Sequence, residues 1–461
     1  MKISGNRDIF AMTLQSEQTT WHNQVNNMKY DENLPRIPEN LSALQAVSSM
    51  MNHWSDELYR RRNTDESLAG ECNFAEFPAT LEEWQSERKR IHKLFEDHIY
   101  GKLPPPPDKL EMRILSEKHG ALNGLAFRRE IRIYCRMNDG RSHDFDMLLY
   151  VPENAETAVP VFVGLNFDGN QANTPDEDVR LTRGATLVPG HWWRTVPTQE
   201  SKRHIKPESW NFEETIRRGY AVATADYGEI FPDNPAGFSQ SIYTLFKGKD
   251  ELTAFPPLGF TRDFGAISAW AWGLSRMLDI LESIDGVDAD NAAVLGHSRL
   301  GKTALWAGAN DERFKLVISK NSGCLGAAPS KRNFGERVGH LVYLQRFWFN
   351  DKIVEYSFKD ENLPVDQHQL LALVAPRALY VASSSEDYGA DPYGEFLSTR
   401  AAAKVWNLYG FADDFPAEQP DLDVSVGSQV CYHIKPGKHS ITEVDWKHYY
   451  DCADRVLKNN K

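Results

Sequence analysis

The 461-residue sequence has few cysteines, no long apolar run and no excess of basic residues, and each of these excludes a class of protein. Its five cysteines are odd in number and lack Cys-x-x-Cys spacing, so neither a disulfide framework nor a zinc ribbon is indicated, although one disulfide stays open. No apolar stretch approaches the roughly 20 residues that cross a bilayer. The net charge of −13 argues against nucleic acid or an anionic membrane as partner, because phosphate binding needs clustered Lys and Arg.

The sequence also lacks a metal-binding motif and a secretory signal. No His-x-x-x-His or comparable cluster appears, so we expect no metal and no cofactor. Residues 1–8 have no apolar core of the kind a signal peptide needs. The protein is therefore either cytoplasmic or made with a leader that this chain does not contain.

An apolar content of 41% with 25% charged residues is typical of a soluble globular protein. Residues 1–80 are polar and weakly periodic, and we interpret them as an extension that wraps the core, with one helix near 41–62. Residues 81–461 are expected to form one domain. Thr80 and Glu83 make a capping box before a helical stripe of apolar residues, and Gly101 ends that helix.

Beyond residue 101 the sequence alternates between buried strands and helices. Nearly continuous apolar runs such as 159–165 predict strands covered on both faces, as in a parallel sheet. The pattern predicts an α/β fold, a three-layer αβα sandwich with a mostly parallel, doubly wound sheet. The strands are expected over 126–135, 144–150, 159–165, 220–225, 293–296, 314–319, 377–382 and 426–434, and the long helices over 263–285 and 445–457.

Residues 293–302, Ala-Val-Leu-Gly-His-Ser-Arg-Leu-Gly-Lys, organise the remaining chain. They predict a short strand, an abrupt turn that carries Ser298, and the start of a helix. Gly-x-Ser in this context is the signature of a nucleophile elbow. Leu300 stands where the generic motif has its second glycine, and Gly301 follows one residue later. On this motif alone an ordinary strand–turn–helix stays an alternative.

A serine nucleophile needs a base, and in this type of fold the acid and then the base follow the serine along the chain. His433 lies within the last predicted strand, and His448 lies on a helix with a charged exposed face, so both are interpreted as structural. His439 lies in a glycine-containing loop just after that strand. It is therefore the predicted base.

Two positions are eligible for the acid. The strand after the elbow ends at Asn321, which cannot carry the charge that stabilises an imidazolium. The next strand is followed by Glu386 and Asp387, with Asp391 close by, and either of the first two would serve. The alternative is an ordinary solvated acidic loop.

From about residue 81 to its end, the chain resembles the glucuronoyl esterases of carbohydrate esterase family 15. Gly-His-Ser-Arg-Leu-Gly-Lys at 296–302 is similar to the family's Gly-x-Ser-Arg-x-Gly-Lys, shifted glycine included. Other stretches look like the bacterial branch of the family. These are 314–336, Leu-Pro-Val-Asp-Gln-His at 363–368, Glu-Asp at 386–387, Ala-Asp-Pro at 390–392 and Gly-Lys-His at 437–439.

The resemblance implies an α/β-hydrolase fold and a cofactor-free serine esterase, a carboxylic ester hydrolase of lignocellulose degradation. Its substrates would be esters between (4-O-methyl-)glucuronic acid on xylan and alcohols of lignin. Ser298 would be the nucleophile, His439 the base and Asp387 the acid of a catalytic triad that forms an acyl-enzyme. Arg299 would complete the oxyanion hole. The resemblance further implies a secreted or periplasmic enzyme, and we expect a monomer.

The resemblance also implies that Lys302 and Glu336 contact the sugar; the alternative for Lys302 is an ordinary exposed helix lysine. Two departures qualify these roles. Many members have Glu at the position of Asn321, and many bacterial members have Trp at the position of Gly389. Trp348, or Trp192 or Trp193, would then substitute for the missing ring.

Two alternatives therefore stay beside a glucuronoyl esterase. One is an esterase of the same fold that acts on other carbohydrate or small esters. The other is a non-catalytic, carbohydrate-binding relative.

Overall fold

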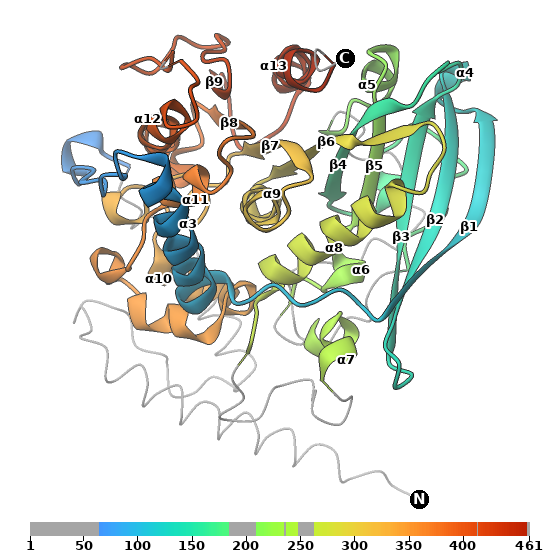
Figure 1. Cartoon of the computed structure of the whole chain (residues 1–461), viewed down its shortest axis with the longest axis horizontal. Coiled ribbons are helices and arrows are strands. Elements are labelled where there is room, and N and C mark those ends of the chain that lie inside the picture. The colour runs from blue at the N-terminus through green and yellow to red at the C-terminus, as the bar shows by residue number, and fades with distance from the viewer. Residues whose placement is uncertain (1–63, 184–208, 235–236, 248–261, 413, 459–461) are drawn as a thin grey trace, which may run out of the picture. The chain divides into compact units, whose positions relative to one another are not determined.

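The structure is a computed structural model that describes residues 64–183, 209–234, 237–247, 262–412 and 414–458 (Figure 1). The helix expected near 41–62 lies outside the described residues, as do Trp192 and Trp193. The chain from Asn63 to Lys461 forms one compact unit, separate from residues 1–62. No helix in the described ranges is both long and apolar enough to span a bilayer.

One nine-stranded sheet runs through this unit in the order β1-β2-β3-β5-β4-β6-β7-β8-β9. The pairs β1–β2, β2–β3 and β3–β5 are antiparallel, and the other pairs are parallel, which confirms the mostly parallel sheet. The strands are β1 Lys109–Gly120, β2 Ala126–Arg136, β3 Ser142–Pro152, β4 Val159–Asn166, β5 Ala221–Asp226, β6 Val287–His297, β7 Phe314–Lys320, β8 Ala378–Ser384 and β9 Val430–Lys435.

Two strand predictions differ from the structure. The edge strand β1 was not predicted, because its side chains are largely exposed or half-buried and the sequence there shows no clean apolar alternation. The last strand begins at Val430 and not at 426. Val426 instead pairs antiparallel with Tyr432, so the chain folds back on itself just before β9.

Helices cover both faces of the sheet. Thr80 caps α3 as expected: its hydroxyl accepts a hydrogen bond from the Glu83 backbone N–H at 3.3 Å and donates to the Glu83 carboxylate at 2.8 Å. The helices are α3 Leu81–Phe95, α4 Ala121–Gly124, α5 Phe212–Arg217, α6 Tyr227–Ile230, α7 Tyr243–Phe246, α8 Ala266–Leu281, α9 Arg299–Asn310, α10 Val338–Gln345, α11 Gln367–Ala372, α12 Pro392–Asn407 and α13 Glu443–Ala453.

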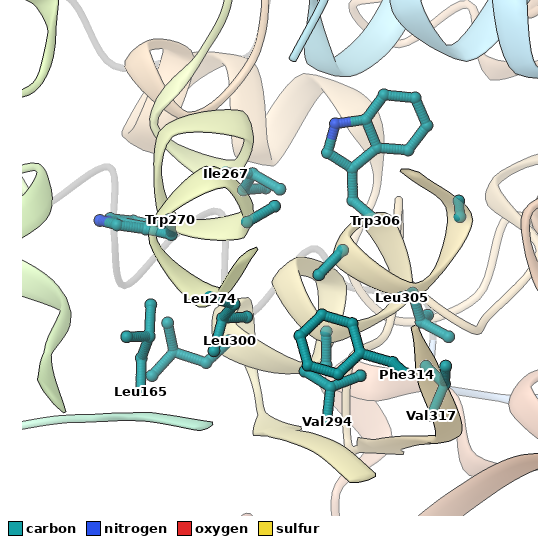
Figure 2. Packing of buried hydrophobic residues seen from close by; sticks show 14 of the residues in the cluster. Leu165, Ile267, Trp270, Leu274, Val294, Leu300, Leu305, Trp306, Phe314 and Val317 are labelled. Carbon is teal, nitrogen blue, oxygen red and sulfur yellow. The ribbon is translucent and has the colours of Figure 1, made fainter. Parts of the chain in front are cut away.

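Alternate residues of the central strands belong to two separate buried clusters, one on each face of the sheet. Val163 belongs to the cluster that α3, α8, α9 and α12 complete, whereas its neighbour Phe162 belongs to the cluster completed by α5 and α13. Figure 2 shows Trp270 of α8 and Trp306 of α9 on the helix side of the cluster that contains Val163, and Val294 of β6 on its strand side. The three-layer αβα sandwich is therefore confirmed, and β6 and α9 lie within its core.

Candidate active site

Ser298 lies between the end of β6 and the start of α9. Its backbone has φ 61° and ψ −128°, a conformation that L-residues rarely adopt and that costs about 1–3 kcal/mol. The Ser298 N–H donates to the Lys320 carbonyl of β7 at 2.8 Å, and the N–H groups of Gly301 and Lys302 donate to the Ser298 carbonyl. These bonds hold the serine in the strained turn that a nucleophile elbow requires.

The spacing of the two glycines follows from close backbone contacts. A Cβ atom on Gly296 would lie 1.8 Å from the Leu300 carbonyl oxygen, because β6 and the first turn of α9 nearly touch. At Gly301 a Cβ would lie 3.0 Å from the Ser322 Cβ. The Leu300 side chain points into the core and is 2% exposed. Gly301 therefore lies on the side of α9 that faces the end of β7.

His439 and Asp387 are brought together by the loops that follow β9 and β8. The His439 Nδ1 lies 2.5 Å from the Asp387 Oδ2. Backbone hydrogen bonds from Ser385 to Lys435 and from Glu386 to Gly437, both 2.9 Å, join the two loops. The His439 side chain is 43% exposed and that of Asp387 is 12% exposed, so the base is accessible and its carboxylate partner is sheltered.

This pair lies next to the elbow. The His439 ring centroid is 4.5 Å from that of His297, the residue before Ser298. The other acidic candidates are placed differently. Asp391 is 1% exposed and forms an ion pair with Arg332, and the Glu386 side chain is exposed. The predicted base and acid therefore contact each other at the carboxyl ends of β8 and β9, and the residue beside the predicted serine packs against the base.

His433 has the structural environment that its place in a strand predicted. It is fully buried, and its Nε2 lies 3.0 Å from the Asp445 Oδ1. The Lys320 Nζ contacts the same carboxylate at 2.7 Å. Burial lowers the pKa of His433 to about 4, so this ring is neutral at neutral pH.

The Arg299 guanidinium is held in place from two sides. It forms an ion pair with Asp233 and lies 4.5 Å from the centroid of the Trp348 ring, and the Trp348 indole N–H donates to Asp233 at 2.7 Å. Phe167, in the loop after β4, lies 5.8 Å from the guanidinium. Asp233 was not predicted. Its only signal in the sequence is an acidic residue a few positions after the strand β5.

Trp348 is 4% exposed, so most of its ring packs within the protein beneath Arg299. Lys302 is also 4% exposed, and its Nζ donates to the Ser322 carbonyl at 2.5 Å. Burial lowers the pKa of Lys302, and the nearby Glu336 carboxylate opposes that shift. Lys302 is therefore not the exposed helix lysine of the alternative interpretation, and it lies close enough to Glu336 for their charges to interact.

Gly389, the position for which the resemblance implied a Trp, lies two residues after Asp387. Its carbonyl accepts a hydrogen bond from the Glu336 N–H at 2.9 Å. Asn321 directly follows β7, is 2% exposed and donates through its side-chain amide to the Ser384 hydroxyl at 3.1 Å. The position for which the resemblance implied a Glu therefore holds a buried, neutral side chain.

A buried carboxylate that the sequence analysis missed lies behind Asp387. Glu395 of α12 is fully buried and accepts hydrogen bonds from the N–H groups of Ser322 and Gly323, at 2.8 and 3.0 Å, and from the Ser383 hydroxyl at 2.6 Å. Burial raises its pKa to about 7. Glu395 thus links the loop after β7 to the end of β8. Over the described residues, no cluster of three or more His, Cys, Asp or Glu side chains could hold a metal ion.

Comparison with known proteins finds similar sequences in fungi and bacteria. The sequence model of the fungal glucuronyl esterases matches residues 249–410. Carbohydrate esterase MZ0003, from an unknown prokaryotic organism, is 38% identical over 392 residues, which are 82% of this chain and 86% of that protein. A 4-O-methyl-glucuronoyl methylesterase of Podospora anserina is 33% identical over 171 residues, 35% of this chain and 36% of that protein.

Two solved structures share both fold and sequence with this chain. A promiscuous CE15 esterase from a marine bacterial metagenome has a TM-score of 0.76 and 36% identity, over 86% of this chain and 100% of that one. A glucuronoyl esterase from Solibacter usitatus has a TM-score of 0.77 and 36% identity, over 85% of this chain and 100% of that one.

Proposed function

Because the chain belongs to the glucuronoyl esterases of carbohydrate esterase family 15, which are carboxylic ester hydrolases, we propose that it hydrolyses esters of (4-O-methyl-)glucuronic acid through Ser298, His439 and Asp387. The observation that carries the proposal is the 2.5 Å contact between His439 and Asp387, beside a serine in a strained turn. A non-catalytic relative would have no need of that arrangement, which also costs backbone strain.

In the proposed reaction the Ser298 Oγ attacks the ester carbonyl carbon, and its proton passes to His439. The tetrahedral intermediate collapses, the C–O bond to the alcohol breaks, and the alcohol leaves with the proton from His439. A water then attacks the acyl-enzyme with His439 again as base, which releases the uronic acid and restores the serine. Asp387 keeps the imidazole oriented and stabilises its charged form.

Negative charge that develops on the carbonyl oxygen needs fixed donors. The Arg299 backbone N–H is the first of helix α9, and helix N-termini carry a partial positive charge. The Arg299 guanidinium, held by Asp233 and Trp348, would be the second donor. Such a donor typically contributes about 3–4 kcal/mol to the transition state. Lys302 and Glu336 would orient the uronate hydroxyls, and Trp348 would contribute by supporting Arg299.

Hydrolysis of benzyl glucuronate by the wild type and three variants tests this assignment. Ser298→Ala should abolish turnover. Asp387→Asn should lower kcat by about 10⁴-fold, the loss typical of the acid in a Ser-His-Asp triad. Glu386→Gln changes the adjacent, exposed carboxylate and is the matched control, expected to stay within about twofold of the wild type. Full activity of Asp387→Asn would show that the acid has been misassigned.

A second candidate function is an esterase of the same fold with other carbohydrate or small esters as substrates. It is favoured by Gly389, which gives a uronate ring no aromatic side chain to pack on, and by a 36% identical relative that is described as promiscuous. Assays of benzyl glucuronate beside an acetylated sugar separate the two. Activity on the acetate alone would overturn the glucuronate assignment.

We further propose that the polymers that carry these esters are glucuronoxylan and lignin–carbohydrate complexes. An enzyme that acts on such insoluble material works outside the cytoplasm, so we place it among secreted or periplasmic proteins. It would act as a monomer, which size-exclusion chromatography with light scattering checks directly.

A further inference from the structure

A surface pocket of about 400 Å³ lies beside the loop that carries Asp387. Ser385 and Tyr388 both line it, so the pocket begins within two residues of the proposed acid on either side. Its volume is within the range of about 300–1,000 Å³ that is typical of small-molecule sites. The proposed ester chemistry does not use this pocket, whose lining includes Ile434 of β9.

The pocket wall exposes apolar and aromatic surface. Tyr388 is 52% exposed, Tyr393 39% and Leu422 50%. The Tyr393 ring is supported from within the protein, because Arg332 lies 5.3 Å from its centroid and Phe396 stacks at 6.1 Å. A supported ring that is partly exposed is a rigid platform for a flat or weakly polar ligand.

The charges around the pocket exclude an anionic ligand. Glu66 and the exposed Asp421 line it, and Arg332 lies behind the wall in ion pairs with both Glu66 and Asp391. The guanidinium is thus paired with two carboxylates, and Asp421 adds a further negative charge to the pocket wall, so the carboxylates outnumber the guanidinium. A uronate would be repelled, whereas the hydroxyl groups of a neutral ligand can donate to the carboxylates.

We propose that this pocket binds a neutral pyranose residue of the polysaccharide main chain, while the esterified uronate lies at Ser298. The inference rests on the proposed function, which supplies the polymer. The C–H face of a sugar ring packs on an aromatic ring such as Tyr393, and its hydroxyls pair with Asp421 and with the side chain of Gln419, which also lines the pocket. The aromatic ring of a leaving alcohol would pack equally well but offers fewer hydroxyl groups to Asp421 and to the Gln419 amide oxygen, whose Nε2 already donates to Pro392 and Tyr432, so the sugar is the better fit.

Binding of a neutral oligosaccharide tests the pocket without any ester. The full chain carrying Ser298→Ala is titrated with xylotetraose by calorimetry, and saturable binding is expected. Adding Tyr393→Ala should weaken it about tenfold, since loss of an aromatic contact of about 1.4 kcal/mol is a factor of ten. The matched control is Phe411→Ala, an aromatic residue with 38% exposure outside the pocket, and it should bind as the parent does.

A second pair of variants distinguishes the loss of a pocket contact from a general effect of substitution on folding. Leu422→Ala lies in the pocket wall, and Val424→Ala, 46% exposed in the same loop, does not line the pocket. In the active enzyme, Leu422→Ala and Tyr393→Ala should raise KM several-fold more for the benzyl ester of a glucuronoxylo-oligosaccharide than for benzyl glucuronate. Val424→Ala should leave that ratio at its wild-type value.

Four results would overturn the inference. They are no binding of xylotetraose, an equal loss of xylotetraose affinity in Tyr393→Ala and Phe411→Ala, and an unchanged KM ratio in the pocket variants. The fourth is binding of coniferyl alcohol, in place of the sugar, at the pocket. Failure of the proposed function has a different signature. Xylotetraose would then still bind, but benzyl glucuronate would not be hydrolysed.

Discussion

Glu395 should make the stability of this protein depend on pH near neutrality. Its fully buried carboxylate joins the backbone of Ser322 and Gly323 to the hydroxyl of Ser383, next to the loop of Asp387. Burial raises its pKa from 4.5 to about 7, and the Asp387 charge acts in the same direction. The native carboxyl therefore holds a proton over a pH range in which the unfolded carboxyl has already lost it.

The sign and size of the effect follow from proton linkage. Between pH 4.5 and 7 the native state binds more protons at Glu395 than the unfolded state, so the free energy of unfolding falls as the pH rises. Below pH 4.5 both states are protonated, and above pH 7 both are ionised, so the contribution becomes constant. With 1.36 kcal/mol for each pKa unit, the loss is about 3 kcal/mol.

Glu395→Gln removes this titration and can keep the hydrogen bonds. Its amide oxygen can accept from the two backbone N–H groups, and its NH₂ can donate to the Ser383 oxygen. Urea unfolding of both proteins at half-unit steps from pH 4.5 to 8, followed by tryptophan fluorescence, measures the difference. The variant should gain about 3 kcal/mol over the wild type across this range.

The difference between the two proteins cancels the contribution of every titrating group that does not interact with Glu395. Glu418→Gln, at an exposed position, is the control and should give a difference that does not change with pH. A flat difference for Glu395→Gln, or one that falls with pH, would show that the buried carboxyl does not lose its proton between pH 4.5 and 8.

Two further predictions concern the elbow. Gly296→Ala places a methyl group 1.8 Å from the Leu300 carbonyl, so the turn must open; we expect loss of several kcal/mol of unfolding free energy, measured by urea denaturation, and a stable, active variant would contradict the geometry. Arg299→Lys keeps the charge but loses the planar group that is paired and stacked, so kcat on benzyl glucuronate should fall by about 10²-fold, with circular dichroism unchanged. An Arg299→Lys variant with the wild-type kcat would show that the guanidinium is not a donor of the oxyanion hole.

Much of the fold could be predicted from local patterns. The apolar runs of β4 and β6 and the Thr80 cap of α3 depend on neighbouring residues, and the structure has them where they were expected. The expected capping box forms only in part, because the Glu83 carboxylate accepts from the Thr80 hydroxyl in place of the Thr80 backbone N–H. The edge strand β1 could not be predicted. Its side chains lie at the surface, pair with β2 alone and need no regular apolar alternation.

The candidate site, too, could be predicted from the sequence only in part. Ser298 could be predicted because strand, turn and helix follow one another within ten residues. The sequence could not decide whether Lys302 is an exposed helix lysine, because the burial of its side chain depends on the Ser322 loop packed around it. Asp233 pairs with a residue 66 positions away, and nothing in its own neighbourhood of the sequence marks that contact.

By itself, the sequence determined that the chain forms an α/β sheet with a nucleophile elbow, and that its glycines are spaced as in one esterase family. Those features are set by backbone conformation and by periodicity, which act over a few residues. Only the tertiary structure decided which carboxylate meets the base, because His439 and Asp387 are 52 residues apart and meet where β8 and β9 end side by side. It also decided that Trp348 supports Arg299, since burial is a property of the packed chain and not of any stretch of it.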